Sequence, residues 1–327
     1  MLVISDSPDQ IDGVRVEQLF TMKTRMKNLK KVRQMRRLVR EFQPDIVHGH
    51  YLTSGGFYAS LSGGRRIVGS AWGSDIHCGP KKSLIETLML WFVLRRCDLL
   101  FAASQDTIDR IRDRGYKRGL ELIRFGVDPD KFKRYFRHGT DEFRILSFRY
   151  CSQVCNPLVI VSGFKKALPR IKNAYLYLVD SGDQIQEVHA MVASDQELTS
   201  HVRFFPRRPH SEMPELYNSA DVGISISSSD GMPSSVIEAM SCELPVIVAD
   251  IPSMKELVEP SVTGHVTKIT ADSVGDIFIK AYAVRSLLPG MGKRARMTVL
   301  DPENRLTWES NMRAAEAAYQ RLVQSES

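Results

Sequence analysis

The chain has 327 residues, 43% of them hydrophobic and 25% charged, and its net charge at pH 7 is +7. A chain of this size can bury a sizeable core and is expected to form two domains. The sequence excludes a membrane-spanning helix, because no apolar run approaches the ~20 residues that such a helix needs, and it shows no signal-peptide pattern. Five scattered cysteines, an odd number, exclude a disulfide framework, so we expect a cytoplasmic protein.

Strands and helices alternate through the first half of the predicted structure. Strands that alternate with helices predict a parallel sheet wrapped by crossover connections. Short apolar runs predict strands at residues 2–5, 44–50, 67–75 (a strand and its exit loop), 99–102 and 121–123. Helical spacing of apolar residues predicts helices at residues 22–42, 54–61, 83–95 and 106–114.

The positive charge is concentrated in the helix predicted at residues 22–42, in which Glu41 is the single acid. We favour a surface helix with one face on the core and the other in solvent. The alternative is adhesion to anionic lipid headgroups, worth about 1 kcal/mol for each basic residue near the surface. Nucleic acid is disfavoured as a partner, since aromatic side chains are not interleaved with the basic ones. The basic residues are Lys23, Arg25, Lys27, Lys30, Lys31, Arg33, Arg36, Arg37 and Arg40.

The second half resumes the alternation after a link that includes Phe125–Pro129 and the charged residues 131–142. A final helix at residues 305–323 carries apolar residues on one face. We therefore expect an α/β protein with two Rossmann-like parallel-sheet domains, residues 1–135 and 136–304, followed by a C-terminal helix in residues 305–327. Strands of the second half are predicted at residues 143–148, 175–179, 202–205, 222–226, 245–249 and 265–266.

The stretch from residue 222 to residue 249 organises the rest of the chain. It predicts a strand, a polar loop, a helix that starts near Pro233, and a second strand. The loop follows a parallel strand, where open α/β sheets bind ligands, and the free N–H groups of a helix N-terminus attract phosphate. Asp230 precedes that helix and Glu238 lies inside it, so a phosphorylated ligand with hydroxyl groups would fit. From spacing alone, a loop or capping acid at Asp230 and a solvated helix acid at Glu238 are the favoured interpretation.

The run from Asp230 to Asp250, DGMPSSVIEAMSCELPVIVAD, resembles the donor-site signature of retaining GT-B glycosyltransferases of family 4, the glycosyl transferases group 1. In that family two acids stand eight positions apart and are usually both Glu. The resemblance implies a GT-B fold, with two Rossmann-like domains facing a cleft and the C-terminal helix packing back on the first. It also implies transfer of a hexose-type sugar from a nucleotide-sugar donor to an acceptor hydroxyl with retention, in polysaccharide, glycolipid or glycoconjugate synthesis.

The resemblance assigns roles to individual residues around the donor. Glu238 would hold the nucleotide ribose, and Asp230 would accept hydrogen bonds from sugar hydroxyls and support an oxocarbenium-like transition state. Arg149 follows the first strand of the second domain, where relatives place an Arg on the donor diphosphate; a surface salt bridge is the alternative. Relatives usually have a Lys several residues later, but here Asn156 stands in a Cys-Asn-Pro run and is expected to be a donor-loop residue. The backbone that would hold the diphosphate belongs to Gly231, Met232, Pro233, Ser234 and Ser235.

The loop at residues 71–75 is similar to the family's loop that faces the acceptor. Trp72, Gly73 and Asp75 are therefore candidate acceptor-side residues, for a saccharide or lipid-linked acceptor. Many members carry a His near this loop and this chain has Trp72, so a positioning His is not carried over. A packed aromatic beside a turn glycine is the alternative for Trp72 and Gly73.

The chain departs from the family in two further places. Relatives have a Gly-rich loop after their first strand, whereas this sequence begins at the second strand, so either its start lies upstream or its first domain is reduced. Glu243 stands where relatives usually have a Gly that ends the donor-site helix, which costs about 1 kcal/mol in a left-handed conformation.

The resemblance also bears on cofactors and location. Family members work without a bound metal, so neither a metal nor another cofactor is expected. A cytoplasmic location is expected from the cysteines, and the basic helix leaves peripheral contact with the inner face of the membrane through residues 22–42 open. Two other functions stay open: a non-catalytic or impaired nucleotide-sugar-binding homologue, and a lipid- or nucleic-acid-binding protein built around that helix.

Overall fold

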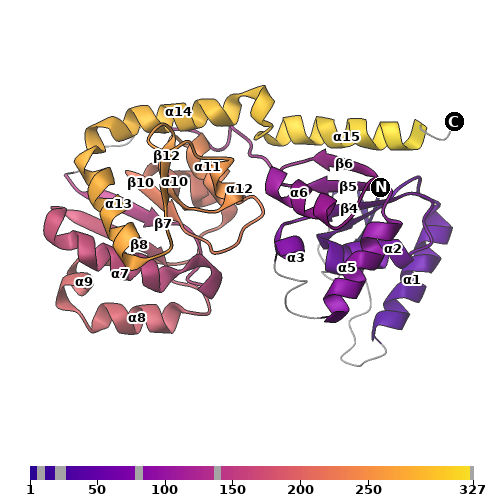
Figure 1. The fold of residues 1–327 in the computed structure, drawn as a ribbon, viewed down its shortest axis with the longest axis horizontal. Helices are drawn as coiled ribbons and strands as arrows, with labels where there is room; N and C mark the ends of the chain where they lie inside the picture. Colours follow the sequence, from indigo (N-terminus) through magenta and orange to yellow (C-terminus); the bar gives the residue numbers. More distant parts are fainter. Residues whose placement is uncertain (6–11, 19–26, 78–83, 136–140, 325–327) are drawn as a thin grey trace. The chain divides into compact units, whose positions relative to one another are not determined.

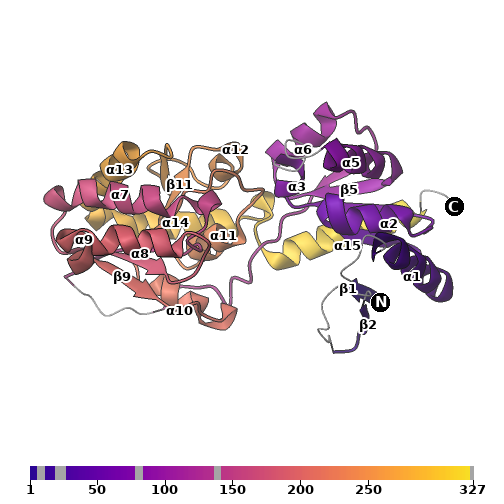
Figure 2. The ribbon, with the colours of Figure 1, turned by 90° about the horizontal axis from the view of Figure 1, so that it is seen from below.

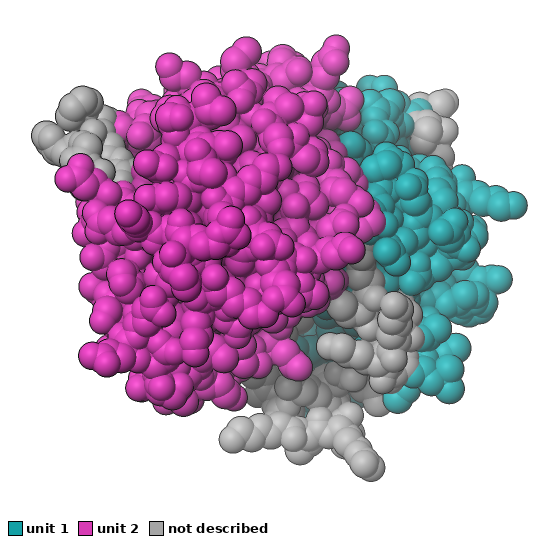
Figure 3. Space-filling view, turned by 60° about the vertical axis from the view of Figure 1, so that its left-hand side comes forward, with its two compact units in different colours: residues 1–123, 314–327 teal, residues 124–313 magenta. Residues whose placement is uncertain are grey.

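We analysed the protein in a computed structural model, which describes residues 1–5, 12–18, 27–77, 84–135 and 141–324. Its helices and strands are shown in two views (Figures 1 and 2). The chain divides into two compact units, and each is described by itself (Figure 3). Unit 1 comprises residues 1–123 and 314–327, and unit 2 comprises residues 124–313.

Unit 1 is built on a parallel sheet of four strands in the order β3-β4-β5-β6. Helices α1, α2 and α5 form one layer, in which α2 contacts both of the others. The buried core under this layer includes Leu52, Leu90 and Val93. The strands are β3 (Val47–His50), β4 (Ile67–Ala71), β5 (Leu99–Ala102) and β6 (Gly119–Leu122). The helices are α1 (Lys27–Phe42), α2 (Phe57–Leu61), α3 (Ser74–His77), α5 (Leu84–Arg96) and α6 (Gln105–Asp113).

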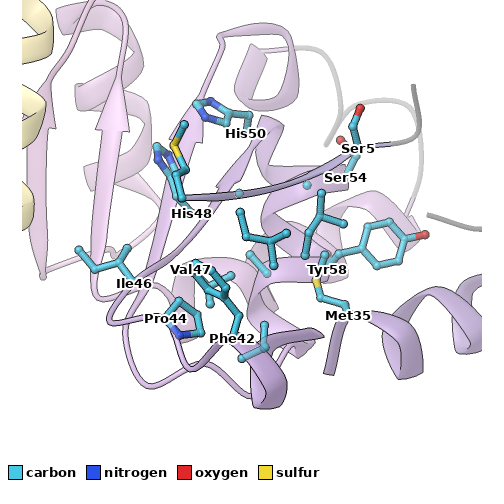
Figure 4. Close-up of a pocket in the computed structure, with 17 residues that line it drawn as sticks. Ser5, Met35, Phe42, Pro44, Ile46, Val47, His48, His50, Ser54 and Tyr58 are labelled. Atoms are coloured by element: carbon cyan, nitrogen blue, oxygen red, sulfur yellow. The ribbon is translucent and has the colours of Figure 1, made fainter. Parts of the chain in front are cut away.

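Two further strands of unit 1, β1 (Leu2–Ser5) and β2 (Arg15–Gln18), form a separate parallel pair. A cavity of about 460 Å³ lies between β1 and β3, with Leu2 and Ile4 on one side and Val47 on the other. Side chains of α1 and α2, among them Met35 and Tyr58, also line it (Figure 4). The sequence did not predict β2, because its run of alternating polar residues is short and lacks an apolar signature.

Unit 2 contains one parallel sheet of six strands in the order β12-β11-β10-β7-β8-β9. Its core includes Phe164 and Phe278, from helices α7 and α13 that pack together. The strands are β7 (Phe143–Ser147), β8 (Ala174–Val179), β9 (Val202–Phe205), β10 (Val222–Ser225), β11 (Val246–Ala249) and β12 (Gly264–Thr267). The helices are α7 (Pro157–Ala167), α8 (Ile185–Ala193), α9 (Gln196–His201), α10 (Met213–Asn218), α11 (Ser234–Ser241), α12 (Pro252–Lys255), α13 (Ala271–Ala283) and α14 (Leu288–Leu300).

The last helix, α15 (Trp308–Gln324), begins in unit 2 and continues into unit 1. In unit 1, its Ala315 and Ala318 pack on the apolar side chains of Val68, Leu99 and Phe101, on the sheet. The expected return of the C-terminal helix to the first sheet is therefore confirmed. The predicted α/β architecture with two Rossmann-like parallel sheets is confirmed as well.

The division between the units falls at residue 123, earlier than the expected boundary at residue 135. Residues of the link pack with unit 2 because Val127 bridges to Thr307 there, and Arg296 donates hydrogen bonds to the carbonyls of Pro129 and Phe132. The basic helix spans residues 27–42, and the first part of the predicted helix, residues 22–26, lies outside the described residues. Within the described part of the chain, none of the helices is both long and apolar enough to span a bilayer.

Candidate functional site

The strand order of unit 2 points to one end of its sheet. The chain runs outward from β7 to β8 and β9 on one side, then returns to place β10, β11 and β12 on the other side. The order therefore reverses between β7 and β10, which hydrogen-bond to each other in parallel. In open α/β sheets, ligands bind beyond the carboxyl ends of the strands at such a switch point. Arg149 follows β7 there, and the loop at residues 226–233 follows β10.

Arg149 joins the two loops at this switch point. Its Nη2 lies 3.0 Å from Asp230 Oδ2, and its Nη1 donates a hydrogen bond of 3.2 Å to Ser235 Oγ in the first turn of α11. The side chain of Arg149 is 26% exposed and that of Asp230 is 15% exposed, so solvent screens their ion pair only in part. The structure thus brings together three residues that the sequence assigned to the donor.

Side chains and backbone groups on both sides fix the β10–α11 loop. The Asn156 amide donates to the carbonyl of Ile226 at 2.7 Å and to Ser228 Oγ at 2.8 Å. On the other side, Ser253 of α12 donates to the carbonyl of Asp230 at 2.7 Å. The Asn156 amide also donates to the carbonyl of Val154. The Asn156 amide therefore holds the β10–α11 loop in place, and its expected part in donor binding stays a prediction.

Glu238 lies inside α11 with its carboxylate almost fully buried. Its Oε2 accepts a hydrogen bond of 2.9 Å from the hydroxyl of Tyr217, and its Oε1 lies 2.9 Å from His210 Nε2. Burial, followed by the charge of Glu238, raises the pKa of Tyr217 well above its usual range, so Tyr217 stays a neutral donor. His210 is mostly exposed, and its ring lies at a tilt against that of Phe132, with ring centroids 5.1 Å apart.

Sequence reasoning missed Tyr217 and His210 because both lie more than 20 residues from Glu238 in the chain. No local motif in the sequence indicates that they are partners of Glu238. The available signal was a Tyr at the end of the short amphipathic helix before β10, since a buried Tyr hydroxyl needs a partner. The carboxylate of Glu238 is therefore oriented by one buried and one exposed side chain.

The first residues of the α11 segment differ in accessibility. Gly231, Met232 and Pro233 are buried, Ser234 is exposed and Ser235 is partly exposed. The first N–H groups of a helix have no acceptor within it, so those of Ser234 and Ser235 have no partner inside α11. After α11, Glu243 has a φ of 58°, the left-handed conformation that the sequence predicted for this position.

In unit 1, the loop after β4 holds the candidate acceptor-side residues. Trp72 is 44% exposed, and Gly73 has a φ of 101°, in the region that favours glycine. The Asp75 carboxylate is fully buried and accepts hydrogen bonds from the backbone of Leu52 at 2.7 Å and of Trp72 at 3.1 Å. Burial raises the pKa of Asp75, and those backbone donors oppose the rise. Asp75 therefore joins the backbone at Leu52 to the Trp72 loop, and its acceptor-side role stays a prediction.

A histidine pair on β3 was not predicted to be part of a site. His48 Nδ1 lies 2.6 Å from the hydroxyl of Tyr319, and its Nε2 lies 2.8 Å from Ser70 Oγ. Burial, followed by the nearby His50, lowers the pKa of His48 to about 3, so its ring is neutral at physiological pH. The rings of His50 and Trp72 are 6.1 Å apart, edge to face. Within the described residues, no group of three or more His, Cys, Asp or Glu side chains is placed to bind a metal.

Comparison with protein families matches both halves of the chain. Residues 130–297, which include the β7–β10 switch point, match the family described as glycosyl transferases group 1. Residues 2–104 match the family described as glycosyl transferase 4-like.

Individual relatives are distant in sequence. One is the N-acetyl-alpha-D-glucosaminyl L-malate synthase of Bacillus anthracis, 24% identical, with 79% of this chain and 70% of the relative covered. Another is the UDP-Gal:alpha-D-GlcNAc-diphosphoundecaprenol alpha-1,3-galactosyltransferase of Escherichia coli, 23% identical, with coverage of 75% and 67%.

Solved structures share the fold. Sucrose-phosphate synthase of Thermosynechococcus elongatus superposes with a TM-score of 0.83 at 16% identity, covering 99% of this chain and 89% of that one. HepE of Anabaena, in complex with UDP and glucose, has a TM-score of 0.77 at 17% identity, with coverage of 94% and 86%. These likenesses establish a GT-B architecture.

Proposed function

The chain belongs to the glycosyl transferases group 1 family, and from this we propose that it transfers a hexose-type sugar from a nucleotide-sugar donor to an acceptor hydroxyl with retention. The observation that carries the proposal is the contact of Arg149 with both Asp230 and Ser235 at the switch point of unit 2. This contact sets a cation and an anion side by side where α/β sheets bind ligands. The named activity of the Escherichia coli relative and the UDP and glucose in the HepE structure support a donor of this class.

In this proposal, the leaving diphosphate is held by Arg149 and the first turn of α11. Charge develops on the diphosphate as the glycosidic bond breaks, and preorganised cations and N–H groups stabilise it. The guanidinium has five N–H donors, and its contacts with Asp230 and Ser235 leave it partly exposed, so it can bind phosphate oxygens without leaving Asp230.

In this proposal, Asp230 and Glu238 accept hydrogen bonds from the uncharged hydroxyls of the donor. Asp230 lies before α11 and would accept hydrogen bonds from the sugar, which strengthen as positive charge develops on the ring. Glu238 would accept hydrogen bonds from the ribose hydroxyls. The ribose would either displace His210, the exposed partner of Glu238, or share the carboxylate with it. Tyr217 keeps the carboxylate in place from the buried side.

We propose further that the positive charge for the leaving group comes from the protein, without a metal or other cofactor. The expected result is full activity in the presence of a chelator. The acceptor is proposed to be a saccharide or a lipid-linked saccharide, which would stack on the 44% exposed side chain of Trp72.

The proposal is tested by incubating the protein with a panel of nucleotide sugars and measuring release of the nucleoside diphosphate. Proton NMR of the product then gives the anomeric configuration, and retention requires the configuration of the donor. Asp230→Asn should lose the release, whereas Asp272→Asn, at a side chain 81% exposed on α13, should keep it. An inverted product would overturn retention, and equal rates in both variants would remove Asp230 from the reaction.

A second candidate is a nucleotide-sugar binder that does not turn over its donor. The observation that favours it is Asp230, a shorter acid than the usual Glu, tied to Arg149. Calorimetry decides between the two: micromolar donor binding without nucleoside diphosphate release for any acceptor would establish the binder. The lipid- or nucleic-acid-binding alternative predicts that binding of lipid or nucleic acid is unchanged when Asp230 or Glu238 is substituted.

A further inference from the structure

Helix α5 exposes a row of large apolar side chains. Leu84, Leu88 and Trp91 are 75%, 57% and 53% exposed, and their spacing of four and three residues places them on one face. Ile85, next to Leu84, is 69% exposed. We call these four residues the α5 strip. The opposite side of α5 is buried in the core of unit 1, so this helix is apolar on both sides. A surface helix of a soluble domain normally presents polar residues outward, and such a patch marks an interaction site.

Cations border the α5 strip. The Arg95 guanidinium lies over the Trp91 ring, 4.1 Å from its centroid, and Arg96 follows as a second exposed cation. Glu86 is the single acid of α5 and is only partly exposed. An aromatic ring with an Arg beside it suits the boundary between an apolar phase and water, where one end of each side chain stays wet.

Helix α1 extends the positive charge on the same side of unit 1. Both α1 and α5 pack against α2, and Figures 1 and 2 show the three helices in one layer. The exposed cations of α1 include Lys30, Arg33, Arg36, Arg37 and Arg40. Its single acid, Glu41, pairs with Arg37 at 3.6 Å. The layer therefore combines an apolar strip on one helix with a net positive charge on another.

We propose that this layer binds the surface of an anionic lipid bilayer, with the α5 strip inserted among the headgroups and the α1 cations on the lipid phosphates. The charge complementarity selects this partner: an acidic surface attracts α1, and an apolar phase accepts the α5 strip. Stable peripheral binding needs both signals, because either one alone gives weak and reversible attachment.

The position of the strip adds a consequence for the acceptor, which rests on the proposed function. Helices that follow parallel strands of one sheet begin at the carboxyl ends of those strands. The first turn of α5, with Leu84 and Ile85, therefore lies at the same end of the sheet as the Trp72 loop. A membrane at this end would present lipid-linked saccharides to that loop.

The test measures co-sedimentation of the full chain with vesicles of phosphatidylcholine alone or with 30% phosphatidylglycerol, with no sugar donor present. The unmodified protein should bind the anionic vesicles at 50 mM salt and lose most binding at 500 mM. The triple variant Leu84→Ser, Leu88→Ser, Trp91→Ser should bind roughly 100-fold more weakly, since each lost apolar side chain costs up to about tenfold. The matched control, Leu287→Ser, Met297→Ser, Leu300→Ser, removes equally exposed apolar side chains of unit 2 and should bind normally.

Insertion of Trp91 gives an independent readout. In a Trp72→Phe, Trp308→Phe background, Trp91 is the remaining tryptophan, because the chain has three. Its emission should shift to the blue with anionic vesicles and be quenched by lipids brominated near the headgroup. Reversal of Arg33, Arg36 and Arg40 to Glu should abolish the shift at 50 mM salt, with unchanged thermal unfolding as the control for folding.

Three results would overturn the proposal. These are absence of binding to anionic vesicles at low salt, equal binding by the triple variant, or a dimer that the triple variant dissociates without a change in lipid binding. The last outcome would make the α5 strip a contact between copies of the chain. Because the assay contains no donor and reads no transfer, its failure leaves the proposed function intact, and a failure of sugar transfer leaves the vesicle result intact.

Discussion

The two units are both parallel α/β sheets, yet their strand-end loops are used in opposite ways. In unit 2, one continuous sheet brings Arg149 and Asp230 from separate loops into a partly exposed ion pair. In unit 1, the comparable strand-end acid, Asp75, is fully buried and binds backbone N–H groups of two loops. The comparison shows two uses of an acid after a parallel strand. Asp230, paired with a cation and partly exposed, can still bind a substrate, whereas the buried Asp75 has its oxygens occupied by backbone N–H groups.

The largest effect is expected at Asp230, the acid that defines the site in unit 2. Asp230→Asn should lower kcat/KM on the order of 1,000-fold. A neutral amide cannot stabilise the cationic sugar, and it removes the ion pair with Arg149. Asp230→Glu should lower kcat about tenfold although it restores the usual residue, since the longer side chain displaces the carboxylate. Steady-state rates measure both, and a faster Glu variant would favour the non-catalytic interpretation.

Asp75→Ala should destabilise unit 1 and leave donor binding by unit 2 unchanged. It leaves the backbone N–H groups of Leu52 and Trp72 without their acceptor, which should lower the free energy of unfolding by about 3 kcal/mol. Chemical denaturation followed by circular dichroism measures the loss. Donor affinity, measured by calorimetry, should stay unchanged, and a large fall in affinity with normal stability would make Asp75 a ligand residue after all.

Arg149→Ala should lower kcat about 100-fold and donor affinity less, because charge grows on the diphosphate only as the bond breaks. Pre-steady-state kinetics separates the two quantities. The control is Arg170→Ala, at an exposed position of unit 2. A double-mutant cycle with Asp230→Asn should be strongly non-additive, since the two side chains form one ion pair. Additive losses would contradict the shared role.

Glu238→Gln should weaken donor binding about 30-fold, which corresponds to roughly 2 kcal/mol, because the amide is a poorer acceptor for ribose hydroxyls. The buried side should tolerate the change, since the amide oxygen can still accept from Tyr217. Glu215→Gln, on the exposed side of α10, is the matched control. Calorimetric affinity equal to that of the unmodified protein would exclude Glu238 from the donor site.

The last prediction concerns the pH dependence of unit 1, where the effect within any single pH unit is small. His48 has its pKa lowered to about 3 in the folded state, so between the unfolded value of 6.5 and about 3 the unfolded chain binds more protons. Stability is therefore lost as the pH falls through this window, by up to about 1.4 kcal/mol for each pH unit. His48→Gln removes this titration while keeping a hydrogen-bonding side chain, so its unfolding free energy should fall less steeply than that of the unmodified protein. Parallel slopes would contradict the prediction.

The sequence predicted the architecture and the placement of Asp230, Arg149 and Glu238 because these depend on local periodicity and on a long motif. It did not predict the partners of those residues. Tyr217 on α10 and His210 in the turn just before α10 meet Glu238 of α11 only through tertiary packing, and no spacing in the chain encodes those contacts. The resemblance likewise gave no indication that Asn156 and Asp75 bind backbone groups of the neighbouring loops. Those contacts exist because backbone groups withdrawn from water need hydrogen-bond partners, which only the folded loops bring within reach.

The separation of β1 and β2 from the main sheet of unit 1 has a consequence for amide hydrogen exchange. A two-stranded parallel pair has little stability of its own, so β1 and β2 should open without disrupting the β3-β4-β5-β6 sheet. Amides of β5, which is paired on both sides, should therefore keep their protons far longer than those of β1 and β2. Unit 1 would then open as two separate cooperative units, whereas the continuous sheet of unit 2 would exchange as one.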